Sequence, residues 1–263
     1  MDPIQAIILG LIQGLTEWLP ISSTGHLRIT ERFMGLTVPL LFDVSLHVGT
    51  LIVTLLFFRK DIKSILVALG KRDFKTENGK LIPLIIVGTV PTALIGAVFS
   101  NATETYFSNF LPMAGAFIIC GVVLYCSKIG NERKENITYM EALVIGTAQG
   151  IAIIPGISRS GLTIAVALLL GIRREKAFKF SFLLSVPAVI GALGLTFYEQ
   201  HEALTLAGVG LTEILVGIAV TIVVSFLALK FLWKILAGRK FHLFAFYCWL
   251  IGMVLVALSL SGF

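Results

Sequence analysis

The sequence predicts an all-α integral membrane protein with six transmembrane helices and two re-entrant helical hairpins, arranged as an inverted-topology repeat. Three observations predict this fold: the composition, two apolar segments that are broken at their centres, and similarity between the two halves of the chain. Of the 263 residues, 57% are hydrophobic and only 14% are charged. A soluble domain of this size cannot bury that much apolar surface, so lipid must solvate much of the chain.

Six apolar stretches are long enough to cross a bilayer, which takes about 20 residues of helix. They lie at roughly 40–58, 81–100, 110–127, 177–197, 208–229 and 241–262. The three cysteines fall inside these stretches without metal-ligand spacing, so we expect Cys120, Cys126 and Cys248 to serve as small apolar residues. No soluble domain is evident beside this single membrane domain.

Two further apolar segments, 4–34 and 140–171, are interrupted near their centres by Pro, Gly and Ser. Each arm is too short to cross a bilayer alone, and the stretch His26–Arg32 is charged, so we predict that both segments are re-entrant hairpins. Non-helical backbone at membrane depth is tolerated only where it is buried in protein or lines a wet cavity. The hairpin tips are therefore expected to form the functional site.

The basic residues predict the orientation. With six crossings and two returning hairpins, most of the 21 Lys and Arg fall on one side, which the positive-inside rule makes cytoplasmic. The N- and C-termini then lie on the outer side. The net charge of +6 thus reflects orientation in a membrane, and the sequence shows no nucleic-acid-binding patch. The cytoplasmic basic residues are Arg59, Lys60, Lys63, Lys71, Arg72, Lys75, Lys80, Lys128, Arg133, Lys134, Arg173, Arg174, Lys176, Lys179, Lys230, Lys234, Arg239 and Lys240.

The two hairpins align without a gap when the sequence is shifted by 136 positions. Each repeat, about 1–136 and 137–263, holds one hairpin and three spans. Because three is odd, the second copy must be inverted in the membrane, an architecture known from transporters with sites near the midplane. The matched pairs are Ala6/Ala142, Gly10/Gly146, Gln13/Gln149, Gly14/Gly150, Ile21/Ile157, Ser22/Ser158, Gly25/Gly161, Gly35/Gly171, Phe42/Phe178 and Ser45/Ser181.

The hairpin tips carry the polar residues of the repeat. The first reads Pro20-Ile-Ser-Ser-Thr-Gly-His26 and the second Pro155-Gly-Ile-Ser-Arg-Ser-Gly161. Each tip places Ser at the start of a short helix, where free N–H groups and the helix dipole attract anions, although simple N-capping would also explain these serines. Two such starts meeting from opposite sides predict a cradle for phosphate. Its predicted substrate-binding residues are Ser22, Thr24, Gly25, Ser158, Ser160 and Gly161.

Two charged residues are predicted to lie deep in the hairpins. Placing the Arg159 cation at that depth costs at least about 2.5–3.5 kcal/mol, and its planar guanidinium suits contact with phosphate oxygens. The alternative is a structural pair with Glu17, and both interactions can hold in the empty protein. Glu17 could act as a general base, orient a nucleophile or help to hold a divalent cation. Gln13 lies four residues earlier on the same helical face, which predicts that it also contacts substrate.

A hydroxyl and an imidazole share the first tip. Ser23 and His26 are three residues apart at a helix start, so their side chains can converge as nucleophile and base, or as nucleophile and leaving-group acid. Asp43 and His47 are spaced i, i+4 at the outer end of the first span. They could contact substrate or metal, and a local pair is the equal alternative.

These residues resemble the undecaprenyl pyrophosphate phosphatases, also called bacitracin-resistance proteins, and the resemblance covers essentially the whole chain. It is carried by Gln13-Gly-Leu-Thr-Glu17, Leu19-Pro-Ile-Ser-Ser-Thr-Gly-His26, Pro155-Gly-Ile-Ser-Arg-Ser-Gly161 and Phe180-Ser-Phe-Leu-Leu-Ser-Val-Pro187. It implies hydrolysis of a polyisoprenyl pyrophosphate lipid to its monophosphate at the outer face of the plasma membrane, which recycles the carrier for cell-wall or surface-glycan synthesis. A homodimer is compatible with it.

The resemblance implies that Glu17, Ser23, His26 and Arg159 carry the chemistry with magnesium or calcium, Glu17 being the metal ligand. Ser23 is favoured as nucleophile, with His26 as the alternative. Gln13 stands where some members carry a glutamate, which argues against a metal site with carboxylates at both 13 and 17. The rival hypothesis is a transporter or flippase for an anionic isoprenoid lipid or solute. A type-2 phosphatidic acid phosphatase is excluded, because its His and Asp do not follow Ser158-Arg159.

Overall fold

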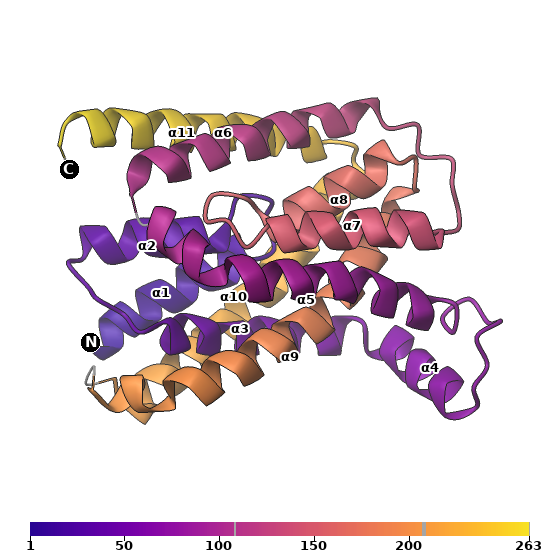
Figure 1. Cartoon of the computed structure of the whole chain (residues 1–263), viewed down its shortest axis with the longest axis horizontal. Helices are drawn as coiled ribbons and strands as arrows, with labels where there is room; N and C mark the ends of the chain where they lie inside the picture. The colour runs from indigo at the N-terminus through magenta and orange to yellow at the C-terminus, as the bar shows by residue number, and fades with distance from the viewer. Residues whose placement is uncertain (108, 207–208, 263) are drawn as a thin grey trace.

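The computed structural model describes residues 1–107, 109–206 and 209–262, which fold mainly into helices with no strand among them (Figure 1). The predicted all-α class is therefore confirmed. The α-helices are α1 Pro3–Thr16, α2 Ser23–Phe33, α3 Leu40–Phe57, α4 Arg59–Gly70, α5 Leu81–Tyr106, α6 Phe110–Cys126, α7 Tyr139–Ile151, α8 Arg159–Leu169, α9 Arg174–Leu206, α10 Leu211–Ala237 and α11 Phe244–Leu260.

Six of the described helices are long and apolar enough to cross a membrane, as the sequence predicts: α3, α5, α6, α9, α10 and α11. The spans of α6 and α11 include a short flanking turn, at 127–129 and 241–243 respectively. The protein is thus a multi-pass membrane protein. The first residue of the span predicted at 208–229 lies outside the described residues, and α10 begins at Leu211 and runs to Ala237. Helix α9 runs from Arg174 to Leu206 and so exceeds its predicted span at both ends, and α10 continues past its predicted span to Ala237.

Helix α4 was not predicted from the sequence, where 59–80 reads only as a basic linker. Its apolar residues recur at i, i+3, i+4 and i+7, as Ile62, Ile65, Leu66 and Leu69, and the last two are at least half exposed. The helix is short and contains several basic residues, so the apolar periodicity was too weak to be recognised in the sequence. Its composition suits a helix lying at a membrane interface.

The two broken segments fold as pairs of short helices. Helices α1 and α2 contain 14 and 11 residues, and α7 and α8 contain 13 and 11. At 1.5 Å per residue each arm is about 20 Å or shorter, less than the roughly 30 Å of a bilayer core. In Figure 1 the first pair occupies the left half of the molecule and the second pair the right half. This arrangement is compatible with hairpins entering from opposite sides.

Corresponding contacts occur in the two halves. Helix α1 packs on α10 as α7 packs on α5. A Cβ atom at Gly10 would lie 2.6 Å from a carbonyl oxygen of α10, and one at Gly146 would lie 2.0 Å from a carbonyl oxygen of α5. The Thr221 hydroxyl donates to the Gly10 carbonyl at 3.2 Å, and the Thr92 hydroxyl donates to the Gly146 carbonyl at 2.8 Å. These contacts are compatible with the inverted repeat, which stays a prediction.

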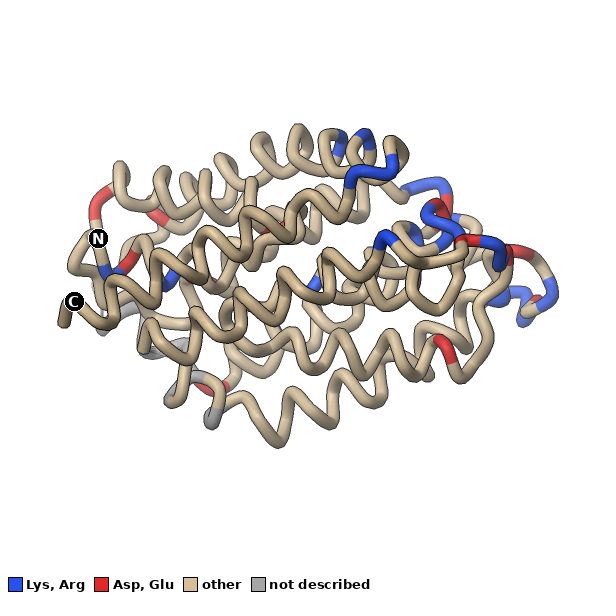
Figure 2. The backbone as a smooth tube through the Cα atoms, turned by 90° about the horizontal axis from the view of Figure 1, so that it is seen from above, with Lys and Arg blue, Asp and Glu red and all other residues tan. Residues whose placement is uncertain are grey.

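The basic residues and the buried aromatic core occupy different parts of the bundle. Figure 2 shows most Lys and Arg gathered at one end of the bundle, with both chain termini at the other end. Between these ends, the broken helices are enclosed by aromatic residues, of which Trp18, Phe117 and Phe182 are fully buried. The Trp18 and Phe182 rings lie 5.0 Å apart. The hairpin tips therefore sit inside the protein core, as irregular backbone at membrane depth requires.

Candidate functional site

The first tip is held by Ser22. This buried residue caps α2 with a positive φ of 67°, a conformation that costs a non-glycine residue about 1–3 kcal/mol. Its hydroxyl oxygen accepts the backbone N–H of Gly25 at 3.3 Å and that of Gly156, in the other hairpin, at 3.0 Å. Ser22 is therefore an N-cap, and it also joins the two tips directly.

The second tip is built in the same way. The Ser158 hydroxyl oxygen caps α8 by accepting the Gly161 N–H at 3.1 Å, and the Ser160 hydroxyl donates to the Trp18 carbonyl at 3.2 Å. Gly156 has a φ of 102°, and a Cβ atom there would lie 2.7 Å from a carbonyl oxygen of α6. The starts of α2 and α8 thus lie together, as predicted for a phosphate cradle.

Two thiols fasten the tips to the surrounding helices. The Ser158 N–H donates to the Cys120 sulfur at 3.4 Å, and the Cys248 thiol donates to the Pro20 carbonyl at 3.5 Å. Both cysteines are buried, as expected for small apolar residues. Their hydrogen bonds to the tips could not be recognised from the sequence, because they join residues far apart in the chain.

Glu17 is the centre of the polar cluster. Its Oε1 atom accepts from Arg159 Nη2 at 2.5 Å, and its Oε2 atom accepts from Ser23 Oγ at 2.6 Å. Gln13 Nε2 donates to Oε2 at 3.3 Å, and His47 Nε2 lies 3.5 Å from the same atom. The pair of Glu17 and Arg159, which the sequence left open as the alternative to phosphate binding, is present in the structure. A buried carboxylate is stable only when it is paired and hydrogen-bonded, and these four groups satisfy that need.

The cluster retains unused hydrogen-bonding capacity. Arg159 donates through Nη2, whereas its Nη1 atom is buried without a hydrogen-bond partner in the described part of the chain. The same holds for Gln13 Oε1. An unpaired buried guanidinium nitrogen is costly, and an anionic oxygen would satisfy it. The starts of α2 and α8 add backbone donors to the same region, so the arrangement suits an anion.

Within the described part of the chain, no hydrogen bond or ion pair joins the His26 side chain to Glu17. Its Nδ1 atom lies 2.8 Å from the Ser22 carbonyl, and its Nε2 atom lies 2.7 Å from the Tyr247 hydroxyl of α11. Tyr247 was missed by the sequence analysis, because 221 residues separate it from His26. Within the described residues, Ser23 therefore contacts Glu17 rather than His26.

A second buried carboxylate was also missed. Glu31 of α2 is 4% exposed, its carboxyl group lies beside that of Asp43, and Arg28 Nη1 lies 3.6 Å from its Oε2 atom. The i, i+4 contact between Asp43 and His47 runs through the main chain of Asp43, whose carbonyl oxygen lies 3.0 Å from His47 Nδ1. His47 thus connects this acidic pair to Glu17. In the sequence, Glu31 reads only as part of a charged stretch.

The donor set fits a cation brought by a phosphate ligand better than a resident metal ion. Across the described ranges, no three His, Cys, Asp or Glu side chains form a group that could hold a metal. Glu17 and the unpartnered Oε1 of Gln13 supply the nearby protein oxygens. Magnesium commonly takes one or two protein oxygens and completes its shell with substrate phosphates and water.

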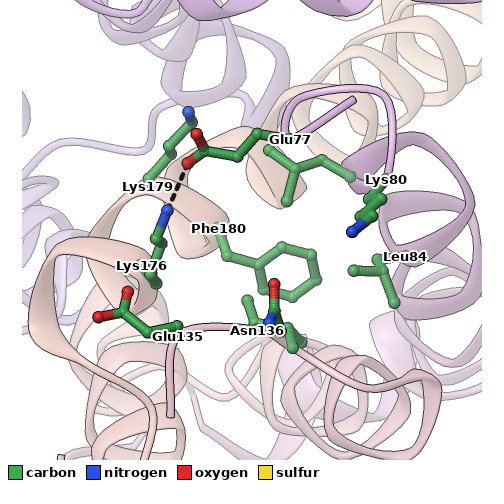
Figure 3. A pocket seen from close by; sticks show the side chains of 10 residues that line it. Glu77, Lys80, Leu84, Glu135, Asn136, Lys176, Lys179 and Phe180 are labelled. Atoms are coloured by element: carbon green, nitrogen blue, oxygen red, sulfur yellow. Dashed lines mark hydrogen bonds and ion pairs between the residues drawn. The ribbon is translucent and has the colours of Figure 1, made fainter. Parts of the chain in front are cut away.

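Two cavities lie apart from the Glu17 cluster. One, of about 290 Å³, is at the basic end, where Figure 3 shows Lys176 bonded to Glu77 above an apolar floor that includes Phe180. The other, of about 380 Å³, is lined almost wholly by apolar side chains of α5 and of the second hairpin, including Ile153 and Ile154. Neither is lined by Glu17, Ser23 or Arg159.

Six spans, two broken helical pairs and a buried carboxylate–guanidinium–hydroxyl cluster define the chain as a multi-pass membrane protein with an internal polar site. The chain belongs to the family of the bacitracin resistance protein BacA, which matches residues 6–254.

Named relatives match over the whole chain. It is 43% identical to an undecaprenyl-diphosphatase of Carboxydothermus hydrogenoformans, covering 100% of this chain and 99% of the relative. It is 40% identical to an undecaprenyl-diphosphatase of Desulforapulum autotrophicum, with 100% and 99% covered, and 36% identical to one of Methanobrevibacter smithii, with 99% of each covered. Proteins with this name in three organisms are thus similar to this chain over essentially its full length.

Proposed function

We propose that the protein hydrolyses undecaprenyl pyrophosphate, or a closely similar polyisoprenyl pyrophosphate, to the monophosphate and inorganic phosphate. The observation that carries the proposal is the Ser23 hydroxyl, bonded to Glu17 beside a guanidinium with an unused donor. A hydroxyl, a carboxylate base and a cation within one buried cluster are what phosphoryl transfer through a serine nucleophile needs. The names of the full-length relatives support the same activity. They give no support to a transporter.

In the proposed first step, Ser23 Oγ attacks the terminal phosphorus and the bond from that phosphorus to the bridging oxygen breaks. The isoprenyl monophosphate leaves with the electron pair of that bond. The Ser23 proton passes to Glu17 Oε2, which already accepts it as a hydrogen bond at 2.6 Å. Arg159 and the starts of α2 and α8 stabilise the negative charge on the phosphoryl oxygens.

In the second step, water attacks the phosphoserine and releases inorganic phosphate, while Ser23 recovers a proton. His26 lies three residues beyond Ser23 and is proposed to assist the proton transfers of the cycle. Its ring nitrogens are held by Ser22 and Tyr247, so Glu17 is the better-placed base for the first step. Ser23 is accordingly preferred over His26 as the nucleophile.

A magnesium or calcium ion is proposed to enter with the pyrophosphate, with Glu17 and Gln13 Oε1 as its protein ligands. When bound, it would neutralise phosphate charge. The basic end of the bundle is proposed to be cytoplasmic, and the termini and the opening of the site to face outward across the plasma membrane. The homodimer stays a prediction.

The test is phosphate release from a long-chain isoprenyl pyrophosphate by detergent-purified protein, with magnesium, calcium or EDTA. Ser23→Ala and Arg159→Ala should abolish release, while Ser185→Ala should not. Ser185 is a matched control, because it is buried and its hydroxyl donates, among the described residues, to the Phe182 carbonyl of its own helix. Failure of the wild-type protein to release phosphate with any ion would refute the proposal. Full activity of Ser23→Ala would refute the assigned nucleophile.

A further inference from the structure

The imidazole of His26 is clamped between three helices. It lies on α2, its ring is nearly parallel to that of Tyr247 on α11, with centroids 5.7 Å apart and an interplanar angle of 17°, and the Phe117 ring of α6 meets it edge-on at 5.6 Å. Each ring nitrogen also has a hydrogen-bond partner, Ser22 at Nδ1 and Tyr247 at Nε2. Packing and hydrogen bonds therefore fix both the plane and the rotation of the ring.

The partners also determine where the ring carries its hydrogen. A backbone carbonyl can only accept, so the 2.8 Å contact with the Ser22 carbonyl requires a hydrogen on Nδ1. In the neutral ring, Nε2 is then an acceptor, and the Tyr247 hydroxyl donates to it at 2.7 Å. When the ring takes up a proton, the same hydroxyl can turn and accept from Nε2–H. Tyr247 is thus a partner for both charge states of His26.

The clamp is connected to the junction of the two hairpins. The Ser22 residue that binds Nδ1 through its carbonyl also joins the tips through its hydroxyl, which accepts the Gly156 N–H at 3.0 Å. The neighbour of Tyr247 on α11, Cys248, bonds to Pro20 of the first tip. Helix α11 therefore contacts the first tip through two successive residues, Tyr247 and Cys248. Tyr247 bonds to the His26 imidazole and Cys248 to the Pro20 carbonyl.

We propose that Tyr247 is a positioning residue for the phosphatase reaction, acting through His26 by fixing the tautomer and orientation of its ring in both charge states. This inference rests on the proposed function, in which His26 assists proton transfer. A group that gains and loses a proton during turnover works best when its surroundings need no rearrangement, which the hydroxyl provides. Through Tyr247, the last span, α11, contributes a side chain to the functional site.

The kinetic test is Tyr247→Phe, which keeps the ring and removes only the hydroxyl. We expect kcat to fall roughly three- to tenfold, the order expected for one neutral hydrogen bond, with KM nearly unchanged. In a His26→Ala background the same substitution should change the residual turnover less than twofold, because its effect passes through His26. Tyr125→Phe is the matched control, since Tyr125 lies in an aromatic cluster with Trp249 and Phe246 and should leave kcat unchanged.

A spectroscopic measurement separates this inference from the proposed function. The chain has four His residues, so the His26 signals can be identified in ¹⁵N-histidine-labelled protein by comparison with His26→Ala. We expect a hydrogen on Nδ1 and an unprotonated Nε2 whose resonance shifts in Tyr247→Phe and does not shift in Tyr125→Phe. An unshifted resonance, or an equal kinetic loss with and without His26, would overturn the role of Tyr247. A shifted resonance in a protein that releases no phosphate would instead overturn the proposed function and leave the contact established.

Discussion

Removing the charge of Glu17 while keeping its shape should separate binding from turnover. In the empty protein, Glu17 competes with the substrate for Arg159, because the two side chains are only 2.5 Å apart. The substitution Glu17→Gln abolishes this competition and also removes a negative charge from beside the incoming phosphate. At roughly 5 Å and an effective dielectric constant of about 20, one charge pair is worth about 3 kcal/mol. We therefore expect KM to fall tenfold or more.

The same substitution removes the group that accepts the Ser23 proton. Loss of a general base typically lowers turnover by about 10²–10⁴-fold, so kcat should fall while KM also falls. Without ligand the variant should also be less stable, by about 2–4 kcal/mol. This is somewhat below the usual cost of breaking a buried pair, because the Arg159 side chain is 19% exposed.

The assay combines phosphate-release kinetics with thermal unfolding, with and without inorganic pyrophosphate. Pyrophosphate should raise the unfolding temperature of Glu17→Gln more than that of the wild-type protein, since it would pair with the released guanidinium. A raised KM with unchanged kcat would refute the reasoning, because Glu17 would then contribute only to binding. Ser185→Ala serves as the control for the substitution of a buried polar side chain.

Three further predictions concern the tips, the metal and the basic end. Gly156→Ala should destabilise the protein by about 2–3 kcal/mol in thermal unfolding, because φ is 102° and the new methyl group would lie 2.7 Å from a carbonyl oxygen; an unchanged unfolding temperature would contradict the tip geometry. Magnesium alone should leave the unfolding temperature nearly unchanged, whereas magnesium with pyrophosphate should raise it; stabilisation by the ion alone would indicate a resident metal site. The hydrogen bond from Lys176 holds the pKa of Glu77 below its usual range, so this pair should contribute stability at neutral pH that is lost as the pH falls through the pKa of the folded state. Because Glu77 is exposed, the difference in pH-dependent unfolding between wild type and Glu77→Gln should be small and should vanish in acid, and a difference that grows in acid would contradict the pair.

The sequence by itself determined the membrane class, the number of spans and the broken helices. Long apolar stretches, and the Pro, Gly and Ser residues that interrupt a helix, are features of neighbouring residues, so they can be recognised without a structure. The serines at the starts of α2 and α8 were predictable for the same reason, because capping is a local interaction. Helix α4 shows the limit of this reasoning, since its basic residues concealed a weak apolar periodicity.

The membership of the cluster was partly accessible from the sequence. Glu17 and Arg159 stood out because a charge at membrane depth is costly and must be paired or functional. This cost made their pairing the alternative to phosphate binding, although 142 residues separate them. The sequence could not decide which side chain the Ser23 hydroxyl would face, because both Glu17 and His26 are close to it along the chain.

Only the tertiary structure decided that question. The meeting of the tips turns Ser23 toward Glu17 and leaves His26 facing Tyr247, and it brings Cys120 and Cys248 into contact with the tips. Such contacts depend on how distant helices pack and leave no periodic trace in the sequence. Local chemistry therefore identified the residues that are costly to bury, and packing determined which partners each of them meets.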